Sequence, residues 1–326
     1  MKVGALSAAW AGKPLEEVLD FYVEIGLEAI EIGTGNYPGT SHCDAIKIVN
    51  DAKKQKALMQ AVESRGLIIS GLSCHGNPLH PKATVARKHH EVWRATVQLA
   101  QKLGIEAVIN FSGLPAGAKG DKVPNWVVAP WPEDHFEALK YQWDEVAIPY
   151  WKTEAEFAAK HGVFICFEMH PNFLVYNPET LIKLRHAVGK HGDRICANFD
   201  PSHLFWQGIN VPKAIRKLHE YGDVIKHFHA KDCKIYDWIS DCYGVLDTKH
   251  YGDEPKRSWI FRTVGYGHSE EGWRDIISTL QMTGYYGTLS LEHEDSLMTA
   301  EEGFRKGVAF LKANVISAPP GEITWA

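Results

Sequence analysis

A short apolar segment followed by a longer amphipathic one recurs eight times along this chain. The apolar segments lie at residues 2–8, 28–33, 67–75, 107–113, 163–170, 194–200, 225–232 and 287–294. Between them, apolar residues recur at i, i+3 and i+4, for example over 85–103 and 271–282, as in amphipathic helices. Apolar strands that alternate with helices form parallel sheets covered by helices. Eight such units favour a closed α/β barrel, the (β/α)8 TIM barrel.

Glycines at the ends of the helical segments support this division. Seven of them stand where a left-handed C-cap would end a helix: Gly26, Gly66, Gly104, Gly162, Gly189, Gly222 and Gly284. An open sheet that binds a dinucleotide would carry a Gly-x-Gly-x-x-Gly turn after its first strand, and none follows residues 2–8. Because no Pro-, Gly- or Ser-rich linker and no compositional break occurs, we expect one domain over residues 1–326.

Two connecting segments are longer than a compact barrel needs. Residues 114–132 contain two tryptophans and four prolines, and residues 233–264 contain two tryptophans and three tyrosines. Both follow expected strands, so we expect both as long loops over the C-terminal mouth of the barrel. Such loops commonly act as lids or bind substrate. Contacts between subunits of a homo-oligomer would explain their aromatic content nearly as well.

Composition excludes several classes of function. The formal net charge is −5, from 35 Lys and Arg against 40 Asp and Glu, and no basic stripe occurs, so nucleic acid is not an expected partner. No apolar stretch approaches membrane-spanning length, and no signal-peptide pattern follows Met1. The six cysteines form no CxxC pair, which fits a reducing compartment. We therefore expect a cytoplasmic protein that does not bind membranes.

Ionisable residues stand at the ends of four consecutive expected strands. They are Glu168, Asp200, His229 and Glu292. Charges in a buried strand are unfavourable unless they are paired or bound to a cation, and polar strand ends at the mouth of such a barrel form active sites. This set suits Mn²⁺, which we place first, or Mg²⁺, Co²⁺ or Zn²⁺. We therefore expect one divalent ion; the alternative is an ion-pair network with Lys231 and Arg262.

The same residues carry a resemblance to a known family. Glu168 after an apolar strand, Asp200-Pro-Ser-His203, His227-Phe-His229-Ala-Lys-Asp and Leu291-Glu292-His-Glu-Asp resemble the xylose-isomerase-like superfamily of sugar isomerases and epimerases. That superfamily also includes AP endonucleases and inosose dehydratases. The resemblance extends from the first strand to Leu311. It implies that the four residues above bind the metal, that His203 contacts substrate, and that Glu168 and Glu292 act as acid and base on opposite faces of a sugar.

The chain departs from the epimerase branch of this superfamily after the seventh strand. In that branch an arginine closely follows the metal-binding histidine, whereas here Lys231, Asp232 and the insertion 233–264 follow. The run Arg262-Thr-Val-Gly-Tyr-Gly-His268 is more similar to members that act on oxidised (keto) sugars, including enzymes that eliminate from 3-keto-glycosides. The resemblance therefore implies a metal site and leaves the reaction open between epimerisation and elimination.

Further residues are candidates for contact with the reacting sugar. By strand alternation His170 points to the same side as Glu168, which makes it a general acid or base candidate. His75 follows the third strand and faces the mouth. Lys231 shares the parity of His229 and could either stabilise an oxyanion or pair with a neighbouring acid. Arg262, in the insertion, is a further candidate for binding substrate.

These observations predict a metal-dependent enzyme of the isomerase or epimerase type. It would remove a proton next to the carbonyl of a small sugar or keto-sugar. A lyase acting on 3-keto-glycosides, or an inosose-type dehydratase, would use the same site and is the first alternative. A metal-assisted hydrolase such as an AP endonuclease would need more ligands and a basic groove. A non-catalytic sugar-binding barrel would be expected to lack at least one of the four ligands.

Overall fold

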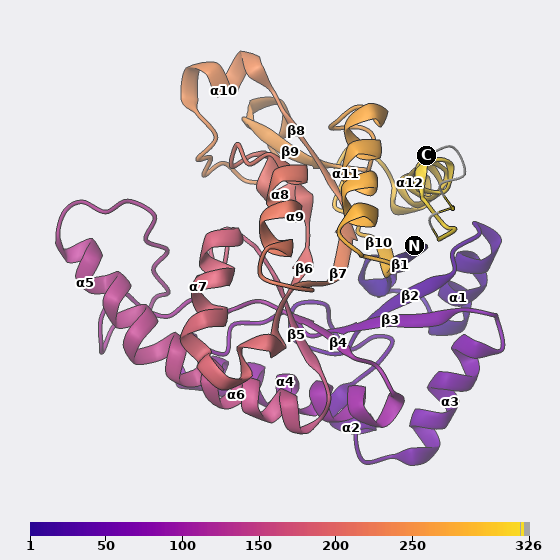
Figure 1. Ribbon diagram of the computed structural model, residues 1–326, viewed down its shortest axis with the longest axis horizontal. Coiled ribbons are helices and arrows are strands. Elements are labelled where there is room, and N and C mark those ends of the chain that lie inside the picture. Colours follow the sequence, from indigo (N-terminus) through magenta and orange to yellow (C-terminus); the bar gives the residue numbers. More distant parts are fainter. Residues whose placement is uncertain (320, 323–326) are drawn as a thin grey trace.

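A closed barrel of eight parallel strands forms the centre of the protein, in a computed structural model that describes residues 1–319, 321 and 322 (Figure 1). The strands are β1 (Lys2–Leu6), β2 (Ala29–Gly33), β3 (Ile68–Ser73), β4 (Ala107–Asn110), β5 (Phe164–Glu168), β6 (Ile195–Phe199), β7 (Ile225–Ala230) and β10 (Thr288–Leu291). They neighbour one another in chain order, and β10 closes the barrel on β1. The (β/α)8 fold is confirmed, and each of the eight expected segments contains one strand. Positions 320 and 323–326 of the expected domain lie outside the described residues.

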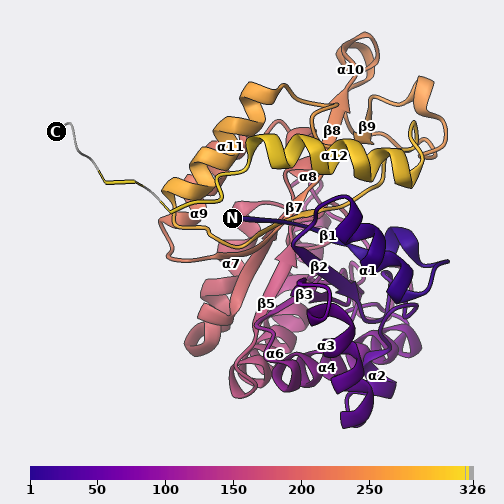
Figure 2. The ribbon, with the colours of Figure 1, turned by 90° about the vertical axis from the view of Figure 1, so that its right-hand side faces the viewer.

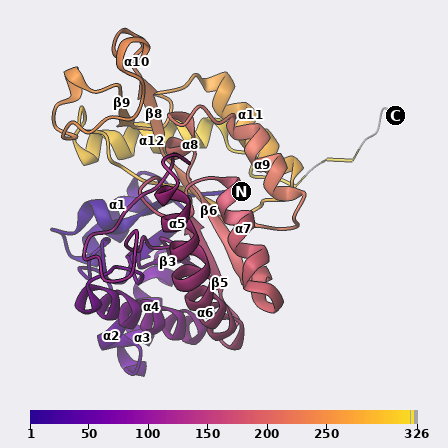
Figure 3. The same cartoon turned by 90° about the vertical axis from the view of Figure 1, so that its left-hand side faces the viewer.

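Helices cover the outside of the barrel. They are α1 (Leu15–Glu24), α2 (Ala45–Ile48), α3 (Ala52–Glu63), α4 (Ala83–Leu103), α5 (Asp134–Lys140), α6 (Ile148–Lys160), α7 (Pro178–Val188), α8 (Pro201–Phe205), α9 (Val211–His219), α11 (Glu270–Met282) and α12 (Ala300–Asn314), with a π-helical stretch, η2 (Tyr141–Ala147), between α5 and α6. On one side α12 lies beside α11 and against β1 (Figure 2). On another side α6 packs beside α7 (Figure 3). Within the described residues, no helix is both long and apolar enough to cross a bilayer.

The core lies between the strands and these helices, and large aromatic side chains fill it. Trp93 of α4 and Trp151 of α6 are fully buried and meet edge to face, with ring centroids 5.8 Å apart. Trp151 also packs on Phe167 of β5 at 4.5 Å. Such contacts fix the helices on the strands. These contacts thereby also hold in place the carboxyl ends of the strands, which carry the polar side chains.

Glycines and a capping side chain explain where several helices end or begin. All seven glycines expected at helix C-termini have positive φ, from 69° at Gly162 to 96° at Gly222, a region that residues with a Cβ rarely adopt. Gly189 (φ 76°, ψ −124°) lies outside the left-handed helical region, so it ends α7 in a different conformation. At the start of α7, Asn177 and Thr180 form a capping box.

The segment 233–264 is not the simple loop that we expected. β8 (Asp232–Ile235) pairs antiparallel with β9 (Trp259–Arg262), and α10 (Asp237–Tyr243) follows β8. The three elements stand together at the top of Figure 1. The expectation was wrong because Trp259-Ile-Phe261 is a buried apolar run whose first ring stacks on Trp206 of α8 at 4.7 Å. Residues 114–132 contain neither helix nor strand, as expected.

A single buried carboxylate ties this insertion to the barrel. Asp232 follows β7 by two residues, and its Oδ2 accepts hydrogen bonds from the backbone N–H groups of Gly265, Gly267 and His268 and from Trp273 Nε1. The sequence run from Arg262 to His268 is therefore a turn wrapped around Asp232. This arrangement holds the chain that returns from β9 against the barrel rim.

Candidate metal centre

Four residues of the types that bind metals converge where β5, β6, β7 and β10 end. Glu168 is the last residue of β5, Asp200 caps α8 directly after β6, His229 lies in β7, and Glu292 follows β10. One ligand-type atom from each residue lies within 4.8 Å of the other three. Parallel strands place their carboxyl ends on one rim, which explains the convergence. The structure thus brings together all four expected ligands in a cluster that suggests a divalent metal ion.

Two atoms of this cluster lack hydrogen-bond partners among the described residues. Asp200 Oδ2 and His229 Nδ1 are both buried and accept or donate no hydrogen bond within the described part of the chain, although Lys231 Nζ lies 3.1 Å from Asp200 Oδ2 as an ion-pair partner. Glu168 Oε2 and Glu292 Oε2 each lie 3.1 Å from His229 Nδ1, but not in hydrogen-bonding geometry. Buried polar atoms are normally satisfied, so unpaired ones need a reason. A cation between these oxygen and nitrogen atoms would satisfy both, and the residues present therefore fit a divalent metal.

Glu31 of β2, which the sequence interpretation missed, lies directly against His229 of the cluster. Both of its carboxylate oxygens lie 3.0 Å from His229 Nε2, and Ser73 and Ser290 also donate to it. Burial alone would raise the pKa of Glu31, but the charges of His229 and His227 lower it to about 2. A signal was present, because Glu31 is the only charged residue of β2, a strand that is buried throughout. Carboxylates that hold the second nitrogen of a metal-binding histidine are common.

Two expected substrate-binding histidines lie directly on Glu168. His203 Nε2 is 2.9 Å from Oε1, and His75 Nε2 is 3.0 Å from Oε2. Asn198 Nδ2 donates to Oε2 at 3.3 Å. Burial opposes ionisation of Glu168, yet the hydrogen bonds with His203 and His75 and the close contact with His229 hold its pKa well below the usual range. The Glu168 carboxylate is therefore fixed in position and ionised.

His170 lies beside Glu168, as expected, but not because of strand alternation. β5 ends at Glu168, so strand alternation does not extend to His170, and that argument was wrong. The imidazole nevertheless lines the pocket beside Glu168, with its centroid 4.0 Å from that of His203. Its Nδ1 faces the carbonyl oxygen of Pro171, which leaves Nε2 as the free ring nitrogen. Burial lowers the pKa of His170 below its ordinary value.

Lys231 is a buried cation among the acids of the site. Its Nζ lies 2.7 Å from Glu292 Oε2, 2.9 Å from Glu294 Oε2 and 3.1 Å from Asp200 Oδ2. Burial alone would lower the pKa of Lys231, but the neighbouring charges of Asp200, Glu292 and Glu294 raise it well above the usual value. Of the two roles considered for Lys231, the structure shows the ion pairs.

Arg262 does not join this cluster. It ends β9, and its Nε donates to Asp295 Oδ2 at 3.0 Å. Asp295 also accepts from the backbone N–H of Thr263. Arg262 therefore fastens the end of the insertion to the segment after β10. The alternative in which Lys231 and Arg262 jointly neutralise the four acids holds for Lys231 only.

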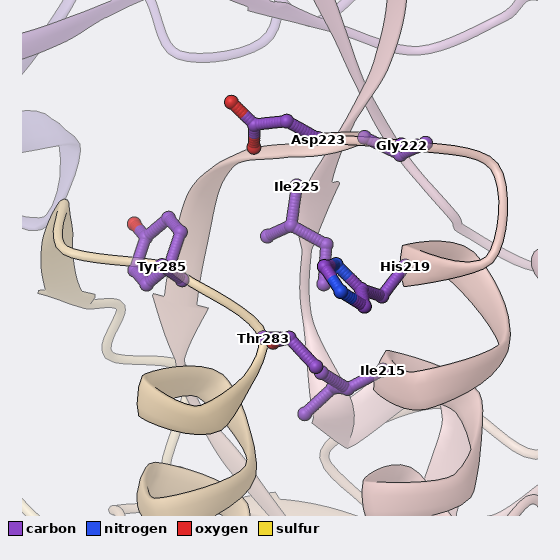
Figure 4. Close-up of a pocket in the computed structure, with 8 residues that line it drawn as sticks. Ile215, His219, Gly222, Asp223, Ile225, Thr283 and Tyr285 are labelled. Carbon is purple, nitrogen blue, oxygen red and sulfur yellow. The ribbon is translucent and has the colours of Figure 1, made fainter.

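A cavity of about 300 Å³ opens over the cluster. Glu168, Glu292, Lys231, His75 and His170 line it, together with apolar surface that includes Phe111. Its volume suits a small molecule. A smaller pocket lies at the opposite end of the barrel, where β7 begins. Its volume is only about 10 Å³, and it lies among Ile215, His219 and Tyr285 (Figure 4). That space is enough for about one water molecule, so the chemistry is expected at the mouth.

Comparisons with known proteins agree with this fold. A family model described as a xylose isomerase-like TIM barrel matches residues 19–314. The uncharacterized protein YfiH of Bacillus subtilis (strain 168) is 38% identical over 318 residues, which cover 97% of this chain and 99% of YfiH.

Several solved structures share the architecture at low sequence identity. The IOLI protein with a bound zinc atom has a TM-score of 0.65 at 16% identity, covering 97% of this chain and 98% of its own. The probable 3-DHS dehydratase AsbF of Bacillus anthracis has a TM-score of 0.64 at 16% identity, covering 96% and 99%. D-psicose 3-epimerase, solved in the presence of D-fructose, has a TM-score of 0.60 at 15% identity, covering 97% and 99%. At these identities the likeness establishes the fold alone.

Proposed function

Since this chain belongs to the xylose isomerase-like TIM barrel family, we propose that it is a divalent-metal-dependent enzyme that removes a proton next to the carbonyl of a sugar or keto-sugar. The observation that carries the proposal is the convergence of Glu168, Asp200, His229 and Glu292. Two buried atoms of this cluster lack hydrogen-bond partners among the described residues. Relatives of the same fold include an epimerase and a probable dehydratase, which supports an enzyme that acts on sugars or related polyols.

The four ligands would be Glu168, Asp200, His229 through Nδ1, and Glu292. The bound ion, for which we propose Mn²⁺ before Mg²⁺, Co²⁺ or Zn²⁺, would supply positive charge that stabilises the oxyanion of an enediolate. The zinc atom in the IOLI protein supports a divalent ion in this fold.

The chain's own residues would move the proton. Glu168 and Glu292 are both held in their ionised forms, since burial is outweighed by hydrogen bonds from histidines at Glu168 and by the charges of Lys231 and His229 at Glu292, which lower both pKa values. An ionised carboxylate can accept the proton of the carbon next to the carbonyl and, once protonated, can return it to the neighbouring carbon; the second carboxylate could return a proton from a different side only after taking one from water. His170, whose Nε2 is free in the same cavity, would be a second acid or base.

Substrate would be oriented by the groups that surround these carboxylates. His75 and His203 bind Glu168 and border the space where hydroxyl groups of the sugar would lie. Lys231 Nζ, already close to Glu292 and Glu294, would donate to a substrate oxygen. Arg262, bound to Asp295, would act through the insertion rather than at the ion.

Elimination is the second candidate reaction. The same enediolate can expel a substituent from the next carbon, as a 3-keto-glycoside-eliminating lyase or a dehydratase would require. The run from Arg262 to His268, which is more similar to members that act on oxidised sugars, favours this candidate. Isomerisation, epimerisation and elimination all begin with proton abstraction, so one experiment tests them together.

That experiment is turnover in deuterated water. The Mn²⁺-loaded protein would be incubated with D-fructose and, separately, with methyl 3-keto-β-D-glucopyranoside, and both product and recovered sugar would be analysed by mass spectrometry. We expect deuterium at the carbon next to the carbonyl with at least one of the two sugars. Glu168→Gln and Glu292→Gln should abolish the uptake. Glu63→Gln is the control, because Glu63 is an exposed residue of α3 that lies outside both the cavity and the ligand set. Turnover without any deuterium uptake would contradict proton abstraction and leave hydride transfer or hydrolysis.

A further inference from the structure

A second cavity, of about 280 Å³, adjoins the first and is walled mainly by aromatic side chains. Trp126 comes from the long loop 114–132, Trp206 from α8, and Tyr251, Trp259 and Phe261 from the insertion. The rings form two stacked pairs: Trp206 with Trp259 at 4.7 Å, and Tyr251 with Phe261 at 5.9 Å. Both segments that exceed the needs of the barrel thus build one pocket.

The two cavities meet at the metal centre. His170 lines both of them. His203, which binds Glu168, lines the aromatic cavity, and Lys231 Nζ lies 4.7 Å from the ring centroid of Phe261. A ligand whose reacting part lies over the four acids can therefore extend past His170 into the aromatic cavity.

The chemistry of the aromatic cavity selects a flat, uncharged group. Asp247 is the one carboxylate on its wall, and it already accepts from the backbone N–H groups of Lys249 and Ser258 and pairs with Lys249 Nζ. A charged group would find no free counter-charge there. The indole and phenyl rings on the wall fit a flat aromatic ring, which can stack on them or meet them edge to face.

We propose that the substrate is a glycoside with an aromatic aglycone, whose sugar lies over the metal centre and whose aglycone lies in the aromatic cavity. The proposal rests on the function proposed above, since it places the reacting sugar at the same four ligands. His170 would then stand beside the bond that joins sugar and aglycone. A second sugar ring fits less well, because its several hydroxyl groups would each need a hydrogen-bond partner, and beside the aromatic rings and Asp247 the polar side chains on the wall are Asn172, Thr248 and two histidines.

The test is calorimetric binding to the Mn²⁺-loaded protein of matched pairs: the phenyl and methyl glycosides of glucose, galactose and xylose, in both anomers, with cellobiose for comparison. For at least one sugar, the phenyl glycoside should bind about 10- to 100-fold more tightly than its methyl partner, the gain expected from burying one aromatic ring. Tyr251→Ala and Trp126→Ala should each reduce this advantage at least several-fold. Trp238→Ala is the control, because Trp238 lies in the same insertion but is 69% exposed and outside the cavity, so the advantage should persist.

Three results would overturn the proposal. They are equal affinities of the phenyl and methyl partners, binding of no phenyl glycoside at all, and tighter binding of cellobiose than of every phenyl glycoside. The bound Mn²⁺ and the deuterium uptake from the keto-sugar would be measured on the same preparations. If those two persist, the metal centre and proton abstraction stand and only the aglycone is wrong.

Discussion

His229 Nε2 lies 3.0 Å from both carboxylate oxygens of Glu31, and this contact decides which ring nitrogen faces the candidate metal site. With Nε2 directed at Glu31, Nδ1 is the atom near Glu168 and Glu292. Glu31 reaches this position from β2, which lies opposite β6 in the closed barrel.

Removing the negative charge of Glu31 should weaken metal binding. In Glu31→Gln the amide keeps the size of the side chain but can present its NH₂ group to His229, so the ring orientation is no longer specified. We expect Mn²⁺ affinity to fall about 10- to 100-fold, as for other carboxylates behind metal-binding histidines. Calorimetric titration would measure it, with Glu28→Gln as the control, since Glu28 is a surface residue that pairs only with Lys2 among the described residues. Unchanged affinity in Glu31→Gln would show that Glu31 serves the barrel and not the metal.

Replacing Lys231 by methionine should make the protein depend on the ion for stability. The substitution leaves Asp200 and Glu292 buried without their cation, which we expect to cost about 3–5 kcal/mol in the free energy of unfolding of the metal-free protein. A bound divalent ion replaces that charge, so saturating Mn²⁺ should raise the melting temperature more in Lys231→Met than in the wild type. Lys226→Met, in the strand that Lys231 directly follows, is the matched control, because its partner Asp223 is exposed and surface pairs contribute little. Equal Mn²⁺-induced shifts in all three proteins would contradict this role.

The turn around Asp232 should tolerate no side chain at Gly267. A Cβ there would meet the carbonyl oxygen of Cys233 at 2.2 Å and Asp232 Oδ1 at 2.4 Å. We expect Gly267→Ala to lower the free energy of unfolding by about 1–3 kcal/mol in urea titrations. Gly272→Ala, in the first turn of α11, meets only Ser269 Oγ at 3.6 Å and should be neutral or stabilising by up to about 1 kcal/mol. If Gly267→Ala were as stable as Gly272→Ala, the tight wrapping of Asp232 would be refuted.

Acid should loosen the insertion through Asp247. Burial would raise the pKa of this carboxyl, but hydrogen bonds from Lys249 and Ser258 lower it to about 2. A group whose pKa is lower when folded stabilises the protein above its unfolded pKa of about 4, and this contribution is lost as the pH falls toward 2. Asp247→Asn should therefore be less stable than the wild type at pH 7, and the difference should shrink between pH 4 and pH 2. Asp253→Asn, at an exposed position in the same segment, should show no such difference. A gap between Asp247→Asn and the wild type that stayed constant down to pH 2 would contradict the assignment.

The barrel and the convergence of the four expected ligands at its mouth could be predicted because both follow from periodic features of the sequence. Apolar strands alternate with amphipathic helices, and Glu168, Asp200, His229 and Glu292 each lie at or just after the end of such a strand. Glu31 was missed because its side chain turns inward from the middle of a strand, and its partner His229 is 198 residues away. The β8–β9 pair was missed because Trp259 and its neighbours are buried against Trp206, a contact that no local pattern reveals.

The central claim, one divalent ion held by Glu168, Asp200, His229 and Glu292, is tested most directly by anomalous scattering from crystals grown with Mn²⁺. We expect a single strong peak per chain within ~2.0–2.3 Å of one oxygen of each carboxylate and of His229 Nδ1. The peak should be absent from crystals of Glu292→Gln prepared in the same way. A peak among Glu31, His227 and His229 instead, or no peak in the wild-type protein, would contradict this assignment of the metal ligands.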